Sequence, residues 1–156
     1  MKLGGQHIFP EHRWRNSLQT NLTFGSFNRP GKLGDPVIDA WSHVLNALPD
    51  SRMMLGNVGD ATLKENLQQR FGRHGIARDR LDFRPRLPMQ EYLSPHHAVD
   101  IVLDTWPYAG GTTTNHAIWT SVPVVSLRGP SRTHCQGAAV MGCVFRTNVT
   151  AVSGRT

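Results

Sequence analysis

The chain has 156 residues, 38% of them hydrophobic and 18% charged, with 17 Lys and Arg against 11 Asp and Glu and a formal net charge of +6. This composition excludes a disordered chain, and the length fits one domain. No stretch approaches the ~20 consecutive apolar residues of a transmembrane helix, and no apolar signal sequence is seen, so we expect no membrane partner.

From residue 22 onward, strand and helix patterns alternate along the chain. The expected strands are short apolar or alternating runs at residues 22–27, 52–55, 81–83, 101–103 and 122–127. The expected helices carry apolar residues at helical spacing and cover residues 36–48, 61–72, 89–97 and 112–120. Strands that alternate with helices predict an α/β fold, a Rossmann-like parallel sheet flanked by helices.

Capping residues and tryptophans refine this prediction. Asp35 before Pro36 is predicted as the N-cap of the first helix, and Asp60 as the N-cap of the second. Trp41 and Trp119 occur at core positions of their helices, so both are expected in the hydrophobic core.

A glycine–threonine loop lies between the fourth expected strand and its helix, at Gly110-Gly111-Thr112-Thr113-Thr114. In α/β sheets, ligands bind at the carboxyl ends of the strands. The glycines allow a ligand to approach the backbone, and the hydroxyls and N–H groups at the helix start favour an anion. An ordinary helix cap is the alternative, and we favour a phosphate site.

The loop after the first strand contains Arg29 and Lys32 within a segment that resembles a Walker A loop. This segment has one residue too many between its glycines, and Leu33 stands where Ser or Thr should bind magnesium. We therefore exclude a P-loop NTPase. Arg29 and Lys32 are expected at the same sheet edge as the threonines, although spacing alone equally allows Lys32 to be a solvated surface lysine.

Metal ligands are not expected. The eight histidines lack metal-site spacing, since His96 and His97 are adjacent and point apart on a helix. His116 is a candidate contact to a ligand, with an ordinary helix-face histidine as the alternative. Cys135 and Cys143 form no Cys-x-x-Cys pair, so we expect packed thiols in a reducing compartment, the cytoplasm.

The basic balance favours a polyanionic partner. No acid occurs over residues 105–156, but no run of five or six basic residues exists anywhere. This distribution favours a local anion site over a nucleic-acid groove, so a basic nucleic-acid-binding domain is our third hypothesis.

Both loops, in order and with their neighbours, resemble the O-linked N-acetylglucosamine transferase family, especially bacterial tetratricopeptide-linked members and SPINDLY-type enzymes. The resemblance covers about residues 22–142. It is carried by Phe24-Gly25-Ser26-Phe27-Asn28-Arg29 with Lys32, by Leu103-Asp104-Thr105-Trp106-Pro107-Tyr108 with Gly110 to Thr114, and by Trp119 and Val122-Pro123-Val124-Val125.

The resemblance implies the C-terminal, donor-binding half of a GT-B glycosyltransferase. Such an enzyme transfers a sugar from a UDP-sugar, here UDP-N-acetylglucosamine, to Ser or Thr hydroxyls of proteins, with inversion and without a metal or other cofactor. The implied catalytic residue is Lys32, at the donor diphosphate. The implied substrate-binding residues are Arg29, Gly110, Gly111, Thr112 and Thr113 at the phosphates, Leu87 and Tyr92 at the nucleobase, and His116 at the ribose.

Three positions depart from the family pattern. His116 stands where a carboxylate is common, Gly111 stands where animal enzymes carry histidine, and Cys135 stands at an expected arginine. We expect an irregular lead-in over residues 1–20, the nucleotide-sugar-binding domain over 21–143, and an irregular tail over 144–156 in which the domain is truncated. The protein or peptide acceptor would bind through a missing N-terminal domain. A non-catalytic nucleotide-binding module is the second hypothesis.

Overall fold

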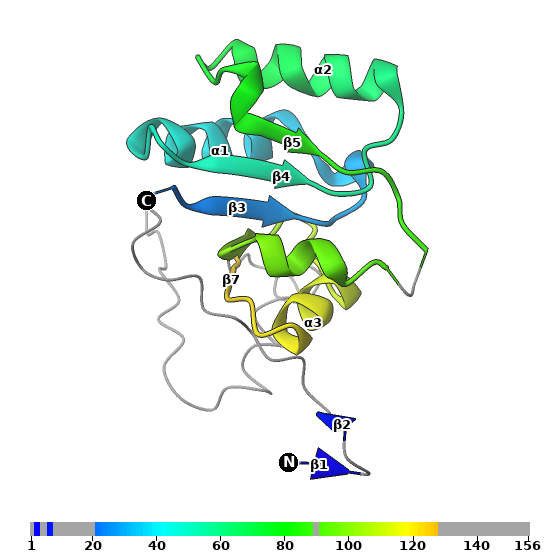
Figure 1. Cartoon of the computed structure of the whole chain (residues 1–156). Coiled ribbons are helices and arrows are strands. Elements are labelled where there is room, and N and C mark those ends of the chain that lie inside the picture. Colours follow the sequence, from blue (N-terminus) through cyan, green and yellow to red (C-terminus); the bar gives the residue numbers. More distant parts are fainter. Residues whose placement is uncertain (1, 4–5, 8–20, 89–90, 128–156) are drawn as a thin grey trace.

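The computed structural model describes residues 2–3, 6–7, 21–88 and 91–127 (Figure 1). Within these residues, five strands form one parallel sheet. Their spatial order is β5 (Leu81–Phe83), β4 (Arg52–Leu55), β3 (Thr23–Ser26), β6 (Ile101–Leu103) and β7 (Val124–Val125). The sheet confirms the predicted Rossmann-like α/β class.

Helices connect successive strands, as right-handed crossovers in a parallel sheet require. The α-helices are α1 (Asp35–Ala47), α2 (Ala61–Gly72) and α3 (Thr112–Trp119). Short 3₁₀ turns occur at η1 (Pro30–Lys32), η2 (Arg78–Arg80) and η3 (Ser94–Ala98). A separate antiparallel pair is formed by β1 (Lys2–Leu3) and β2 (Gln6–His7).

Helices pack on both faces of the sheet. Each strand contributes to both, because its successive side chains point to opposite faces. On β4, Met53 and Leu55 pack with α1 and α2 in one buried cluster, whereas Met54 packs in a second cluster with Ala117 of α3. In Figure 1, α1 and α2 accordingly lie near β4 and β5, while α3 lies near β7. These two clusters form two hydrophobic cores, one on each face of the sheet.

The helix boundaries are partly as predicted. Asp60 caps α2, and its Oδ2 accepts a hydrogen bond from the Leu63 N–H at 2.7 Å. The prediction for α1 was wrong by one residue, because Gly34 is the N-cap and Asp35 belongs to the first turn. Asp35 instead pairs with Arg70 of α2, at 2.8 Å between Oδ1 and Nη2.

Three further predictions were wrong. The helix expected at 89–97 is the 3₁₀ turn η3 in its described part, because Pro95 lacks the N–H that a longer helix needs. The strand expected at 122–127 is paired only at β7, beside Pro123. Trp119 is 50% exposed, because it follows Ala117 by two residues and therefore lies on the opposite side of α3. Trp41 is buried as predicted.

Gly25 in the central strand gives a stability prediction. A Cβ at Gly25 would lie 2.7 Å from both γ-carbons of the buried Val99, whose β-branched side chain cannot easily turn away. We expect Gly25→Ala to lower the free energy of unfolding by about 1–3 kcal/mol in urea titrations. Gly72→Ala is the control, because nothing lies within 4 Å of its added Cβ. Equal stability of the two variants would contradict the prediction.

Candidate functional site

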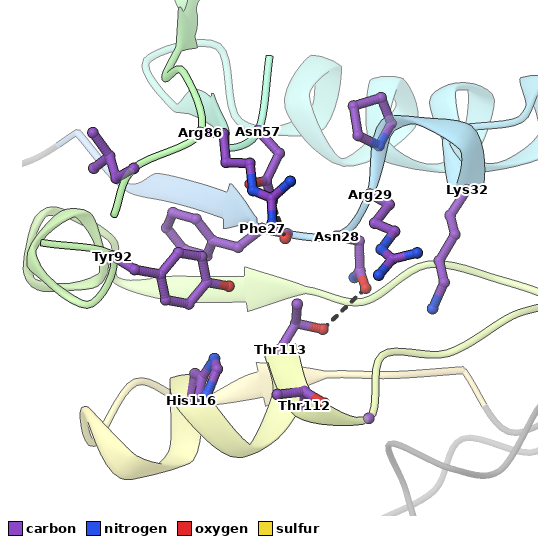
Figure 2. A pocket seen from close by; sticks show the side chains of 13 residues that line it. Phe27, Asn28, Arg29, Lys32, Asn57, Arg86, Tyr92, Thr112, Thr113 and His116 are labelled. Atoms are coloured by element: carbon purple, nitrogen blue, oxygen red, sulfur yellow. Dashed lines mark hydrogen bonds between the residues drawn. The ribbon is translucent and has the colours of Figure 1, made fainter. Parts of the chain in front are cut away.

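The two central strands form the switch point of the sheet. After β3 the chain continues toward β4, and after β6 it continues toward β7, so the loops at their carboxyl ends diverge. A pocket of about 950 Å³ opens between them (Figure 2). Eight of the nine predicted site residues line this pocket, namely Arg29, Lys32, Leu87, Tyr92, Gly111, Thr112, Thr113 and His116.

Lys32 connects the two loops across the pocket. It lies in η1, and its Nζ donates a hydrogen bond to the carbonyl of Ala109 at 3.0 Å. An ammonium group has three protons, so the others remain available to a ligand. Lys32 is therefore not a solvated surface lysine, since its side chain is half-buried and points to the opposite loop.

The start of α3 faces the same pocket. Gly111 is the N-cap, and none of the described side chains caps the first turn of α3. Thr112 is exposed, and Thr113 Oγ1 donates to Asn28 Oδ1 at 3.0 Å (Figure 2). An uncapped helix start presents N–H groups and a positive dipole end, which suit a phosphate.

Asp104 organises both loops from behind the pocket. The carboxylate is buried, and its Oδ1 accepts from Asn28 Nδ2 at 3.1 Å, from Thr105 N at 2.8 Å and from Gly110 N at 2.7 Å. Its Oδ2 accepts from Ser126 Oγ at 2.9 Å. The sequence indicated Asp104 only as the acid that ends a strand, because hydrogen bonds to a folded-back loop leave no local pattern.

Gly110, the ninth predicted residue, does not line the pocket. It is buried, and a Cβ there would collide with Thr113 Oγ1 and lie 3.0 Å from Asp104 Oδ1. Its structural contribution is the close approach of the loop to Asp104 and to α3.

Aromatic rings form one end of the pocket. The rings of Tyr92 and His116 meet edge to face with centroids 5.2 Å apart, and Phe27 stacks on the buried His96 at 3.8 Å. Burial raises the pKa of the Tyr92 phenol. Burial, and next the neighbouring His116, lower the pKa of His96 to about 4 from an ordinary 6.5. At neutral pH, Tyr92 and His96 are therefore uncharged. The rings of Phe27, Tyr92 and His116 line this end of the pocket, and His96 lies buried against Phe27.

The lowered pKa of His96 predicts a loss of stability in acid. Between pH 6.5 and about 4, the unfolded chain binds a proton at His96 that the folded chain excludes. The free energy of unfolding should therefore fall as the pH falls through this window, by up to about 3 kcal/mol. His96→Phe keeps a stacked ring without a titrating group, so urea titrations should show a flatter pH dependence.

The exposed neighbour supplies the control for this prediction. His97→Gln should change the pH dependence only slightly, because His97 is exposed and is the smallest of the three causes that lower the pKa of His96. A wild-type slope in His96→Phe would show that other groups cause the acid sensitivity.

Three polar residues that line the pocket were not predicted from the sequence as ligand-site candidates. Asn28 follows β3, Asn57 follows β4 and Arg86 follows β5. Asn57 has a left-handed backbone (φ 62°), and its Nδ2 donates to the Phe27 carbonyl at 2.7 Å. A signal did exist for Asn57 and Arg86, since parallel strands bring all their carboxyl ends to one edge of the sheet.

The pocket carries positive charge. Arg29, Lys32 and Arg86 line it, and no acidic residue occurs among its described lining residues. Within the described part of the chain, no three His, Cys, Asp or Glu side chains gather as metal ligands would. No helix in that part has the length and apolar character needed to cross a membrane. The arrangement can hold an anionic ligand that also carries a flat ring.

The sheet order and its pocket define a Rossmann-like ligand-binding domain, as found in GT-B glycosyltransferases. The chain belongs to glycosyl transferase family 41, which matches residues 11–149. This finding confirms the resemblance that the two loops carried.

Individual relatives agree with this assignment. The chain is 31% identical over 135 residues to the probable UDP-N-acetylglucosamine–peptide N-acetylglucosaminyltransferase SPINDLY of Solanum lycopersicum. The aligned region covers 83% of this chain and 14% of that protein. An O-GlcNAc transferase mutant of Thermobaculum terrenum superposes with a TM-score of 0.76 and 33% identity, over 78% of this chain and 24% of that one.

A more distant structure shares the fold. HepE of Anabaena, solved in complex with UDP and glucose, has a TM-score of 0.55 and 21% identity, over 78% of this chain and 32% of that one. The chain spans about 14% of the length of the curated relative from Solanum lycopersicum.

Proposed function

We propose that this chain binds the nucleotide-sugar donor of a cytoplasmic protein O-glycosyltransferase. The observation that carries the proposal is that Lys32 and the uncapped start of α3 converge on one cationic pocket, from the ends of two adjacent strands. The names of the relatives support UDP-N-acetylglucosamine as donor and a peptide as acceptor, and we propose a Ser or Thr hydroxyl as the group that receives the sugar. The nucleotide-sugar-binding domain would comprise residues 21–143, and the acceptor would bind to another domain.

The pocket suits a metal-independent, inverting transfer. When the bond between sugar and diphosphate breaks, negative charge grows on the leaving diphosphate. Lys32, the Thr112 hydroxyl and the N–H groups of Thr112 and Thr113 at the helix start would stabilise this charge without a metal, and Arg29 would add a second cation. Fixed donors of this kind need little rearrangement during the reaction.

The aromatic end of the pocket suits the nucleoside. Tyr92 would contact the face of the base beside the backbone of Leu87, and His116 would contact a ribose hydroxyl. The hydrogen bonds that a base and a ribose need can come from backbone groups and the imidazole.

Calorimetry of UDP binding to the 156-residue chain tests the proposal. We expect binding with the same Kd in EDTA and in magnesium, because the phosphate donors all belong to the protein. Strict magnesium dependence would contradict the metal-independent mechanism, and no binding by a folded sample would contradict the donor site. GDP serves as the comparison nucleotide, and tighter binding of GDP would overturn the choice of uridine.

A further inference from the structure

We propose that Arg86 is a phosphate-binding residue of this pocket and provides a third cation for the donor diphosphate. The inference rests on the proposed function and adds to it a residue that lies outside the two loops by which the site was predicted. Arg86 follows β5, two strands away from the Lys32 loop, and lines the same pocket. The pocket is therefore bounded by cations from two separate strand ends.

The side chain of Arg86 is directed into the pocket. Figure 2 shows it extending inward, between Tyr92 on one side and Arg29 and Lys32 on the other in this view. Tyr92 marks the aromatic end, and Lys32 marks the end near the start of α3. A ligand that spans the pocket would pass the Arg86 guanidinium.

The neighbouring arginines are all engaged within the protein. Arg84 pairs with Asp82 at 2.8 Å, Arg78 pairs with Glu65 at 2.8 Å, and Arg80 donates to the carbonyl of Leu45 at 2.7 Å. Arg86, by contrast, donates no hydrogen bond and forms no ion pair within the described residues.

The charges in the pocket are left uncompensated by the protein. Arg29 and Arg86 are both exposed arginines without an intramolecular ion pair in the described part of the chain, and Lys32 is the third cation. Like charges gathered in one concave site repel one another, and an anionic ligand removes that repulsion. The pocket is therefore organised for a ligand with several negative charges.

A phosphate fits the free guanidinium better than a base does. Lys32 already donates one hydrogen bond to the Ala109 carbonyl, and the Thr113 hydroxyl donates to Asn28. Arg86 has all five N–H donors available in a planar fork, which matches two oxygens of a phosphate. A free nucleoside diphosphate also carries one more negative charge than its sugar ester, so a third cation favours the departing diphosphate.

The test compares Arg86→Gln with Arg84→Gln, a matched control two residues earlier that pairs with Asp82 outside the pocket. Calorimetry with UDP, UMP and uridine measures each Kd on chains whose melting temperatures show that they are folded. We expect Arg86→Gln to weaken UDP about ten- to a hundred-fold and uridine less than about two-fold. Arg84→Gln should leave all three constants unchanged.

Two further measurements sharpen the result. Arg86→Lys keeps the charge and should recover part of the UDP affinity, because it lacks the bidentate fork. Added salt should weaken UDP binding more steeply in the wild-type chain than in Arg86→Gln.

Each other outcome overturns the inference. Equal losses for uridine and UDP would place Arg86 at the base, and unchanged UDP affinity would make it a solvated side chain. Failure of the folded wild-type chain to bind UDP would instead overturn the proposed function on which the inference rests. The wild-type measurement therefore separates the two failures.

Discussion

Replacing Asp104 with alanine is expected to lower the free energy of unfolding by about 3–5 kcal/mol. The buried carboxylate accepts from the N–H groups of Thr105 and Gly110 and from the side chains of Asn28 and Ser126. Alanine leaves these donors without their acceptor, and each buried donor that stays unpaired costs about 1–3 kcal/mol. Nucleotide binding should weaken as well, because the same hydrogen bonds hold both loops of the pocket.

Urea titration of two further variants checks this explanation. Asp104→Asn keeps one acceptor oxygen for Oδ1's three partners and should lose only about 1–2 kcal/mol. Asp82→Ala removes a half-buried carboxylate of the edge strand β5 that pairs with the exposed Arg84, so a loss below about 1 kcal/mol is expected. If Asp104→Ala were as stable as Asp82→Ala, Asp104 would not organise the loops.

Replacing Lys32 with alanine is expected to weaken UDP binding about ten- to a hundred-fold. The substitution removes a charge-assisted hydrogen bond worth about 1.5–3 kcal/mol to a phosphate. The fold should survive, because Lys32 lies in the short turn η1 and makes its hydrogen bond to Ala109 at the rim of the sheet. Calorimetry gives the affinity, and the melting temperature reports on the fold.

Lys64→Ala is the matched control for Lys32→Ala. Lys64 is an exposed lysine on α2 whose Nζ lies 5.7 Å from the centre of the Phe83 ring, outside the pocket. It should leave the Kd for UDP unchanged. An unchanged Kd in Lys32→Ala as well would remove Lys32 from the proposed mechanism.

The pocket residues predicted from the sequence are those that a local sequence pattern marks. Lys32 follows a strand in a turn-rich loop, and Thr112 and Thr113 follow a glycine pair at a helix start, so both groups were predicted for one sheet edge. The structure brings both groups into one pocket. Their roles toward a ligand stay predictions.

The other pocket residues depend on the order of the strands in the sheet, which no single segment of the sequence reveals. Arg86 and Asn57 reach the pocket only because β4 pairs with β3 and β5 pairs with β4 on the same side of the sheet. Asp104 joins the two loops through one hydrogen bond to Asn28, 76 residues away in the sequence. The expected helix at 89–97 failed for a local reason, because Pro95 interrupts the hydrogen bonding that the apolar spacing suggested.

The hydrogen bond from Lys32 to Ala109 joins residues that are 77 positions apart. The pocket therefore exists only after β3 and β6 have paired, and a chain folded on one side alone has no complete site. A bound nucleotide would add its binding free energy to this long-range pairing, about 2.7 kcal/mol at a hundredfold excess over Kd. The cellular supply of donor would then govern how long the folded chain persists, as well as whether its site is filled.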